Sequence, residues 1–254
     1  MPPHITKLTL CSHVPIDYNS IPETVEELRF ISDIDRHVTT IHIYPNMLPK
    51  SLKVLMIHDL RNQYVFHEDG LPEFLERLEL HCDYVLEGRI TFVKELHVNN
   101  FNPLNEINKL PSSLEKLVLS RVSPYVLIQF PESFILNKPI GLDVLPNSLK
   151  ELTLGESFEQ PILVGSIPNS VTKLCIINWN YDKPIEAGTI PPSVQYLELM
   201  TTNLTKDQIY VPHTLQTIKS NNFIPPFFGK LERGQEEFDN FCTTYYPLTK
   251  SAIE

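Results

Sequence analysis

The chain has 254 residues and a formal net charge of −10, because Asp and Glu (31) outnumber Lys and Arg (21). Nucleic acids and anionic membranes select basic faces, so this charge argues against both as partners. Glycine is scarce at 8 residues, and neither a G-x-G-x-x-G nor a P-loop sequence occurs, so we expect no nucleotide or other cofactor.

The cysteines and the N-terminal residues bear on the compartment. Cys11, Cys82, Cys175 and Cys242 lie far apart and form no C-x-x-C pair, which is typical of reduced thiols rather than a disulfide framework. The first residues contain neither a basic n-region nor an apolar h-region, and no apolar run is long enough to span a membrane. We therefore expect a cytoplasmic protein.

A short phrase recurs along the chain, with the pattern Leu/Ile-Pro-x-Ser/Thr-Leu/Val-x-x-Leu-x-Leu in its best copies. Such a fixed period of about 20 to 50 residues predicts a solenoid of stacked turns. Two weaker copies without proline occupy residues 34–43 and 90–98, and the register between Leu119 and Leu145 is unclear, as either a degenerate turn or an insertion. The other copies lie at residues 2–10, 21–30, 48–57, 71–80, 110–119, 145–154, 167–176, 190–199 and 211–218.

Each copy predicts a bend followed by a short strand. Proline fixes φ and lacks an N–H donor, so it marks the entry and cannot lie inside a central strand. Leu152 and Leu154 then point inward, while Glu151 and Thr153 alternate with them and point outward. The recurring phrase thus predicts an array of about eleven turns over residues 1–220 with one parallel sheet.

The return limbs are predicted from aromatic residues that follow the strands. Phe101, Phe158 and Trp179 each precede a proline and an aliphatic residue, and we expect these aromatics to pack behind the sheet. Ser157 occupies the place where leucine-rich repeats usually carry a buried asparagine.

The phrase, followed by F-N-x-P-I and a glycine before the next Ile-Pro, resembles the FNIP repeat, a leucine-rich-repeat variant of amoebae and large DNA viruses. Residues 145–199 match well, with Gly165 and Gly188 at the glycine of the family, and most of residues 1–220 match loosely. The resemblance implies a right-handed arc with the sheet on its concave side, no enzymatic activity and, for a viral protein, the host cytoplasm. Members often begin with an F-box that links them to ubiquitin ligases, but residues 1–20 here already form a repeat.

Residues 221–254 depart from the repeat pattern and are rich in aromatic residues. A solenoid end exposes its core and needs a cap, which is the first interpretation of this segment. The alternative is a patch for self-association. The residues concerned are Phe223, Phe227, Phe228, Phe238 and Phe241.

Outward strand positions stack into two rows that form a candidate partner-binding face. Thr40 is placed between Glu27 and Val54 in the first row, and His42 between Arg29 and Met56 in the second. Charges alternate in the first row, which is equally expected of a structural charge ladder, whereas Val54 and Met56 form an apolar spot suited to docking. The candidate residues are Arg29, His42, Val54, Met56, Arg77, Glu79, Glu95, His97, Lys116, Val118, Glu151, Lys173, Tyr196 and Glu198.

Catalytic and metal chemistry find little support in the sequence. His81, Cys82 and Asp83 with His97 form the densest cluster of ligand types, but no H-E-x-x-H or paired C-x-x-C spacing accompanies them, so no metal site is predicted.

Ser112, Ser148, Ser170 and Ser193 are the serines of the recurring turn, whereas a catalytic residue occurs once. The sequence therefore predicts a non-catalytic protein-interaction scaffold. The alternative is a structural component that forms homodimers through its aromatic C-terminal segment.

Overall fold

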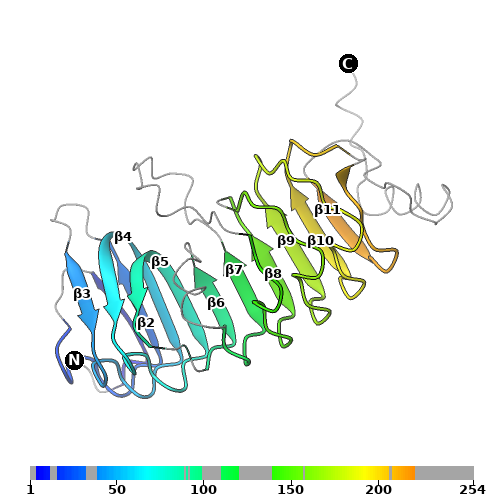
Figure 1. Ribbon diagram of the computed structural model, residues 1–254. Coiled ribbons are helices and arrows are strands. Elements are labelled where there is room, and N and C mark those ends of the chain that lie inside the picture. The colour runs from blue at the N-terminus through cyan, green and yellow to red at the C-terminus, as the bar shows by residue number, and fades with distance from the viewer. Residues whose placement is uncertain are drawn as a thin grey trace, which may run out of the picture.

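The computed structural model describes residues 4–11, 16–32, 39–88, 90, 92–98, 110–119, 139–156, 158–205 and 208–220. Within these ranges eleven strands form one parallel sheet whose strands lie side by side along the molecule (Figure 1). The predicted solenoid with a parallel sheet and loop-rich return limbs is therefore confirmed. The strands are β1 (Lys7–Cys11), β2 (Glu27–Ile31), β3 (Thr40–Ile43), β4 (Val54–Phe66), β5 (Arg77–Leu86), β6 (Glu95–Val98), β7 (Lys116–Leu119), β8 (Glu151–Leu154), β9 (Lys173–Ile177), β10 (Tyr196–Met200) and β11 (Thr217–Ser220).

The predicted place of β3 is wrong. β2 pairs directly with the first half of β4, so that Glu27 is the partner of Val54, whereas Thr40 in β3 pairs with Gln63 in the second half. The register shifts between Asp59 and Gln63. On one side, β4 therefore pairs with β2 along its first half and with β3 along its second half. No proline or glycine interrupts residues 54–66, which explains why this strand runs on past the bend.

The sheet continues directly from β7 to β8. Lys116 pairs with Glu151 and Leu119 with Leu154. The unclear stretch after Leu119 therefore places no strand between them. Residues 120–138 themselves lie outside the described residues.

The recurring proline begins a β-turn. In each of the proline-containing copies from β2 onward, the carbonyl of the proline accepts a hydrogen bond from the N–H three residues later, as in Pro49 to Leu52 (3.1 Å) and Pro146 to Leu149 (3.1 Å). The hydroxyl residue before that apolar position often donates to the preceding turn, as Ser51 does to the Val25 carbonyl at 2.7 Å. The turn thus explains why proline and a hydroxyl residue recur at this spacing.

Ser113, not Ser112, is the residue equivalent to Ser148. The hydroxyls of Ser113 and Ser148 donate to the backbone carbonyls of Val93 (3.1 Å) and Leu114 (2.6 Å). The expected structural role of the turn hydroxyls is thus confirmed for Ser148. It is wrong for Ser170 and Ser193, whose buried hydroxyls have no hydrogen-bond partner among the described residues.

A left-handed residue lies three positions before the proline of several turns. Gly165 and Gly188 adopt φ of 82° and 85° there. Non-glycine residues take the same conformation at the same position in other turns, where they are Asn19 (62°), Asn46 (64°), Asp69 (59°) and Asp143 (60°). Asn and Asp tolerate positive φ because their short polar side chains bond locally, so the glycine of the repeat is one of three acceptable residues.

Replacing Asp143 by alanine is expected to lower the free energy of unfolding by about 1–2 kcal/mol, because a Cβ without a polar group disfavours the left-handed conformation. Asp143→Gly is expected to be neutral or slightly stabilising. Urea denaturation followed by circular dichroism measures both variants, and an equal loss in the two would contradict the assignment.

The core lies between the sheet and the return limbs. The inward leucines of β2 and of β4 to β10 are buried, whereas those of β1 are partly buried. Behind the sheet the rings of Phe158 and Tyr181 stack with centroids 6.1 Å apart. The expectation for Phe158 is correct, but that for Trp179 is wrong, because Trp179 is 50% exposed and Tyr181 takes the buried place. Phe101 lies outside the described residues.

A buried asparagine does occur in the turn after Ser157, but at a position that is not equivalent to Ser157. Asn178 donates from Nδ2 to the Phe158 carbonyl at 2.8 Å, and Thr201 donates similarly to the Tyr181 carbonyl at 2.7 Å. Phe158 and Tyr181 each donate to the carbonyl three residues earlier, which makes Gly155 the equivalent of Asn178. Ser157 lies outside the described residues.

The predicted C-terminal cap, residues 221–254 with Phe223, Phe227, Phe228, Phe238 and Phe241, lies outside the described residues. Within the part that the structure describes, no helix is long and apolar enough to cross a membrane.

Candidate functional site

The outward side chains of the sheet form two rows, which we call the strand face. They alternate with buried leucines and isoleucines along each strand, and the parallel register places equivalent residues side by side. The first row is Lys7, Glu27, Val54, Arg77, Glu95, Lys116, Glu151, Lys173, Tyr196 and Thr217. The second row is Thr9, Arg29, Met56, Glu79, His97, Val118, Thr153, Cys175, Glu198 and Lys219.

Charged residues on the strand face pair across neighbouring strands. Such partly exposed pairs each contribute about 0–1 kcal/mol, so they balance charge more than they stabilise. The face therefore carries cations and anions in nearly equal number, although the whole chain is strongly acidic. The pairs are Lys7–Glu27 (2.6 Å), Arg77–Glu95 (3.8 Å), Lys116–Glu95 (2.6 Å), Lys173–Glu151 (3.4 Å) and Lys219–Glu198 (2.7 Å).

Glu79 lies at the centre of a denser network. It was expected to be an outward residue, but its partners cover it and it is 5% exposed. His58 Nε2 lies 3.0 Å from Oε2, Arg77 donates to Oε1, and His97 Nδ1 lies 3.4 Å from Oε1. Burial raises the pKa of Glu79, but the hydrogen bonds from His58 and Arg77 outweigh it and bring the pKa to about 2. The carboxylate is therefore ionised near neutral pH.

The network extends to both sides of Glu79. Arg29 Nη2 lies 3.0 Å from His58 Nδ1, and because arginine has only donors, this nitrogen must accept and the proton of His58 is on Nε2. On the other side His97 Nε2 lies 2.8 Å from Glu95, which also binds Lys116 at 2.6 Å. Side chains of β2, β4, β5, β6 and β7 are thus connected.

The structure separates the residues of the cluster noted in the sequence. Cys82 is 1% exposed and packs in the core, whereas His81 is on the side of Glu79 and is 4% exposed. His58, which the sequence analysis missed, is the register partner of His81. The sequence carried a signal for it, because the register that places Met56 beside Glu79 also pairs His58 with His81 two residues later.

Other predicted face residues take different environments. His42 is separated from the strand face and stacks against His67, with Nδ1 3.0 Å from its Nε2. Tyr196 donates its hydroxyl to Glu198 at 3.2 Å, and the Lys173 ammonium lies 5.6 Å from the Tyr196 ring centroid. His42 therefore no longer belongs with the other candidates.

The apolar side chains of the strand face flank the network. Val54 and Met56 on β4 and Val118 on β7 are each partly exposed. Val54 and Met56 lie next to Arg77 and Glu79 on one side, and Val118 lies two strands away from Glu79 on the other side. Partly exposed apolar groups beside charged ones form the kind of surface that a protein partner covers.

The cysteines differ in access. Burial raises the pKa of Cys175, which is 4% exposed, and that of Cys82 rises well above the usual range for the same reason. We expect Cys11, which is exposed, to react with a thiol reagent in the native protein while Cys82 and Cys175 remain protected until denaturant is added. Peptide mass spectrometry after timed alkylation checks this, and rapid labelling of Cys175 would show that its strand opens.

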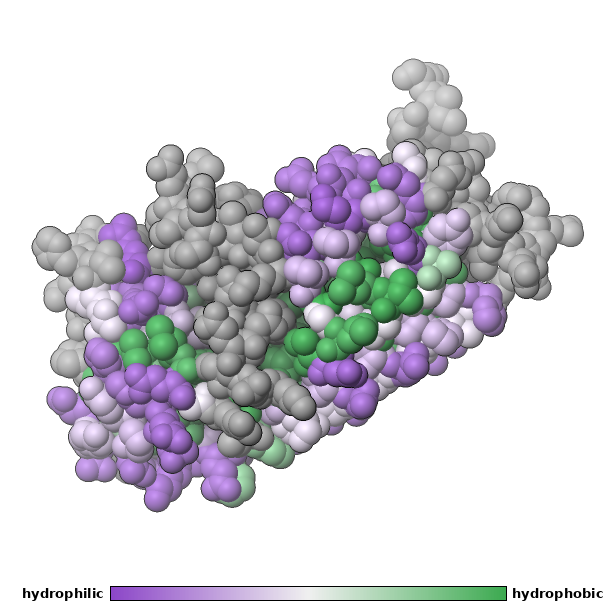
Figure 2. All heavy atoms as spheres, viewed as in Figure 1, coloured by the Kyte–Doolittle hydropathy of each residue, from purple (hydrophilic) through white to green (hydrophobic). Residues whose placement is uncertain are grey.

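A second apolar area, the return-limb patch, consists of Leu142 (61% exposed), Leu163 (40%) and Val164 (52%). Figure 2 shows hydrophobic surface gathered in the region of β8 to β10. Leu142 and Val164 each lie against the left-handed glycine of the next turn. The patch adjoins an open groove of about 570 Å³ that includes Pro168 and Pro191.

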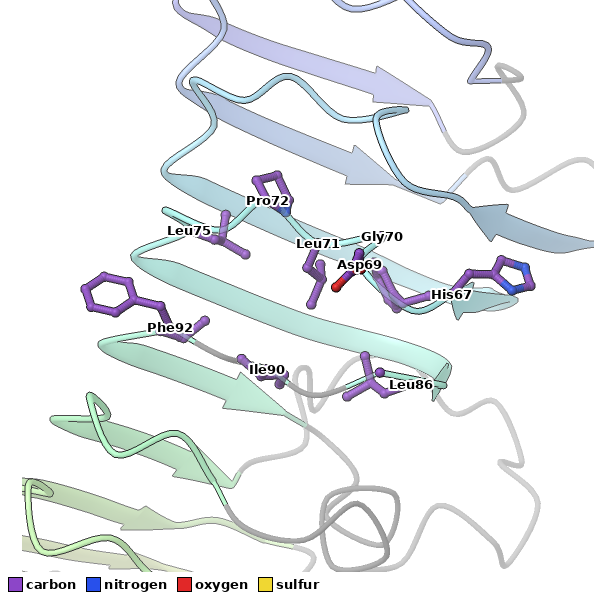
Figure 3. A pocket seen from close by; sticks show the side chains of 12 residues that line it. His67, Asp69, Gly70, Leu71, Pro72, Leu75, Leu86, Ile90 and Phe92 are labelled. Carbon is purple, nitrogen blue, oxygen red and sulfur yellow. The ribbon is translucent and has the colours of Figure 1, made fainter.

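A further cavity lies between the turn that joins β4 to β5 and the segment after β5 (Figure 3). Its volume is about 40 Å³, and Leu71, Leu75 and Phe92 are among the residues that line it. Small-molecule sites usually measure about 300–1,000 Å³, so this cavity is a packing gap and offers no substrate site.

The family comparison concerns the most regular part of the array. The model described as FNIP Repeat matches residues 137–178 and 172–201. Residues 137–201 are FNIP repeats. These FNIP repeats contain β8, β9 and β10, together with Gly165 and Gly188 at positive φ, so the resemblance inferred from the sequence is confirmed there.

Comparison with solved structures finds a likeness to CroV588, described as a novel circular LRR protein. The sequence identity is 19% and the TM-score is 0.42. The match covers 87% of this chain and 40% of that chain, so the present chain spans less than half the length of CroV588. None of the curated proteins matches the sequence.

Proposed function

We propose that the protein is a non-catalytic scaffold whose strand face binds a protein partner. The observation that carries this proposal is the continuous face of two rows, in which Val54, Met56 and Val118 lie beside a charge network. The parallel register from strand to strand supplies the regular stacking that keeps such a face continuous.

The chemistry of the face indicates what kind of partner it fits. Its cations and anions are largely paired with one another, so a strongly charged partner gains little from it. A partner with an apolar centre and a polar rim of both signs would cover Met56 and Val118 while exchanging hydrogen bonds with the network.

Site-specific photocrosslinking tests the proposal. A photoreactive amino acid at Val118 is compared with the same residue at Leu142 in the return-limb patch, in the native cell of the protein. We expect a distinct crosslinked partner from Val118, and Met56→Arg in the same chain should reduce its yield at least about tenfold.

Crosslinks from Leu142 alone would move the binding site to the return limbs and overturn the assignment to the strand face. Crosslinks from Val118 only to a second copy of this chain would replace the partner by self-association. Light scattering on the purified chain then measures the oligomeric state directly.

A further inference from the structure

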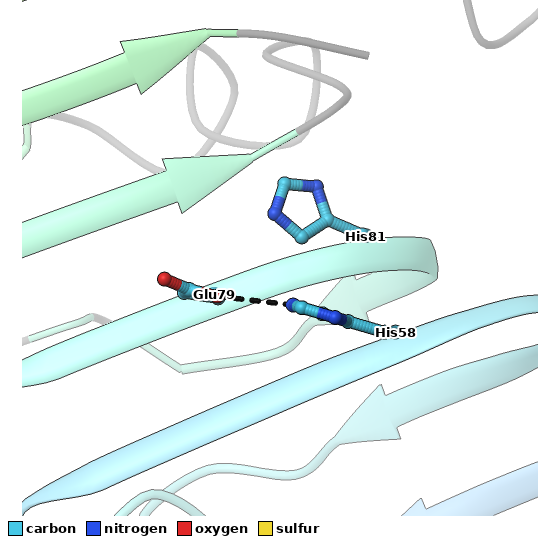
Figure 4. Close-up of side chains that lie close together, drawn as sticks. All are labelled: His58, Glu79 and His81. Atoms are coloured by element: carbon cyan, nitrogen blue, oxygen red, sulfur yellow. Dashed lines mark hydrogen bonds and ion pairs between the residues drawn. The ribbon is translucent and has the colours of Figure 1, made fainter. Parts of the chain in front are cut away.

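His58, Glu79 and His81 form a compact cluster of metal-ligand groups on the strand face (Figure 4). Glu79 and His81 are two residues apart on β5 and therefore point to the same side, and His58 on β4 is the register partner of His81. One ligand atom from each residue lies within 4.8 Å of the others. Two imidazoles and one carboxylate are thus presented by two adjacent strands rather than by loops.

His81 supplies a second, independent observation. Its side chain is 96% buried, since only 4% is exposed, and its Nδ1 has no hydrogen-bond partner among the described residues. A buried nitrogen without a partner is unfavourable and calls for a ligand or water. An imidazole nitrogen without a hydrogen bond can offer its lone pair to a metal ion.

We propose that His58, Glu79 and His81 bind a divalent transition-metal ion such as Zn²⁺. Imidazole and carboxylate ligands suit zinc, copper and nickel, and bonds of about 2.0–2.1 Å place tetrahedral ligand atoms about 3.4 Å apart. His58 Nε2 and Glu79 Oε2 are already 3.0 Å apart, so the ion replaces the proton that joins them. The ligand atoms lie within 4.8 Å of one another, so His81 moves toward this pair by up to about 1.4 Å to reach the separation of about 3.4 Å.

The residues around the cluster affect metal binding in both directions. Arg77 and the solvent access at His58 favour it, whereas Arg29 disfavours it. Arg77 holds Glu79 through Oε1 and leaves Oε2 for the ion. The His58 side chain is 25% exposed, so the ion has a path from solvent and a fourth position for water. Arg29 opposes binding, because metal on Nε2 of His58 shifts the proton to Nδ1, which then meets the arginine donor.

Zinc titration of the untagged full-length chain tests the inference, with ZnCl₂ in competition with a chromophoric chelator. The wild type is expected to bind one Zn²⁺ per chain at micromolar concentration. His58→Ala, His81→Ala and Glu79→Gln are each expected to weaken binding at least about tenfold. His213→Ala, at an exposed histidine outside the cluster, serves as the matched control and should bind as the wild type does.

Arg29→Gln is expected to tighten zinc binding, a change that misfolding of the variant would not produce. Its amide oxygen can accept the Nδ1 proton of metal-bound His58, so we expect about tenfold tighter zinc binding. Co²⁺ should give the visible absorption of a tetrahedral site in the wild type and in this variant. Absence of saturable one-to-one binding, or wild-type affinity in His58→Ala and His81→Ala, overturns the inference. The titration uses the purified chain without a partner, so a failure of zinc binding would leave the proposed partner binding untouched.

Discussion

Asp59→Ala is expected to lower the free energy of unfolding by about 3–5 kcal/mol, because it leaves several buried donors without an acceptor. Asp59 is fully buried at the bend of β4. Its carboxylate accepts hydrogen bonds from Asn62 Nδ2 (2.7 Å), from the Tyr64 hydroxyl (3.0 Å) and from the N–H of Arg61 (3.1 Å). The carboxylate thus stabilises the irregular turn that allows β4 to pair first with β2 and then with β3.

Tyr64→Phe is the matched control for Asp59→Ala. It removes one of these hydrogen bonds and keeps the ring, so we expect a loss of about 1–2 kcal/mol. Asn62 also accepts from the N–H of Thr39 at 2.9 Å, next to β3, so amide exchange in Thr40–Ile43 should accelerate in Asp59→Ala. Urea denaturation and hydrogen exchange give the two measurements. Equal destabilisation by the two substitutions would show that the carboxylate is not the centre of the cluster.

Leu152→Ala in β8 is expected to destabilise the protein by about 2–5 kcal/mol, because it removes a fully buried side chain and leaves a cavity. Leu152 is the register partner of Leu117 on one side and Leu174 on the other. Since each turn is held by its neighbours, the loss affects three adjacent strands rather than one.

Thr153→Ala, on the outward side of the same strand, is the control for Leu152→Ala and should change stability by less than about 0.5 kcal/mol. Thermal and urea unfolding of both variants measures the difference. A loss for Leu152→Ala no greater than that for Thr153→Ala would contradict the assignment of inward and outward positions. A broadened transition would show that the array no longer unfolds as one unit.

The regular features of the array could be predicted because they depend on local chemistry. Proline with a following hydroxyl residue starts the turn, and the two-residue alternation of Leu152 and Leu154 with Glu151 and Thr153 orients the strand. The rows on the strand face follow from these two features wherever the turn length is constant. The same reasoning failed at β3, because the pairing of β3 with the second half of β4 depends on the bend after Asp59. No proline, glycine or repeat motif in the sequence predicts that bend.

The glycine of the repeat shows a related limit. Gly165 and Gly188 are recognisable in the sequence as the glycine of the repeat. Asn46, Asp69 and Asp143 adopt the same left-handed backbone conformation, but the sequence analysis did not identify them. The signal was present, since each lies three residues before the proline. Asn, Asp and Gly share a backbone conformation rather than a side-chain shape, and only the φ values make that common property visible.

The sequence by itself determined that the chain forms stacked turns with one parallel sheet, and which strand residues point into the core. Only the tertiary structure decided that Glu79 is covered by its partners and that β3 pairs with the second half of β4. The physical reason is that core burial follows a period within each strand, whereas contacts between outward side chains depend on the register between strands. That register includes the irregular bend at Asp59, which the hydrogen bonds of a single buried carboxylate hold in place.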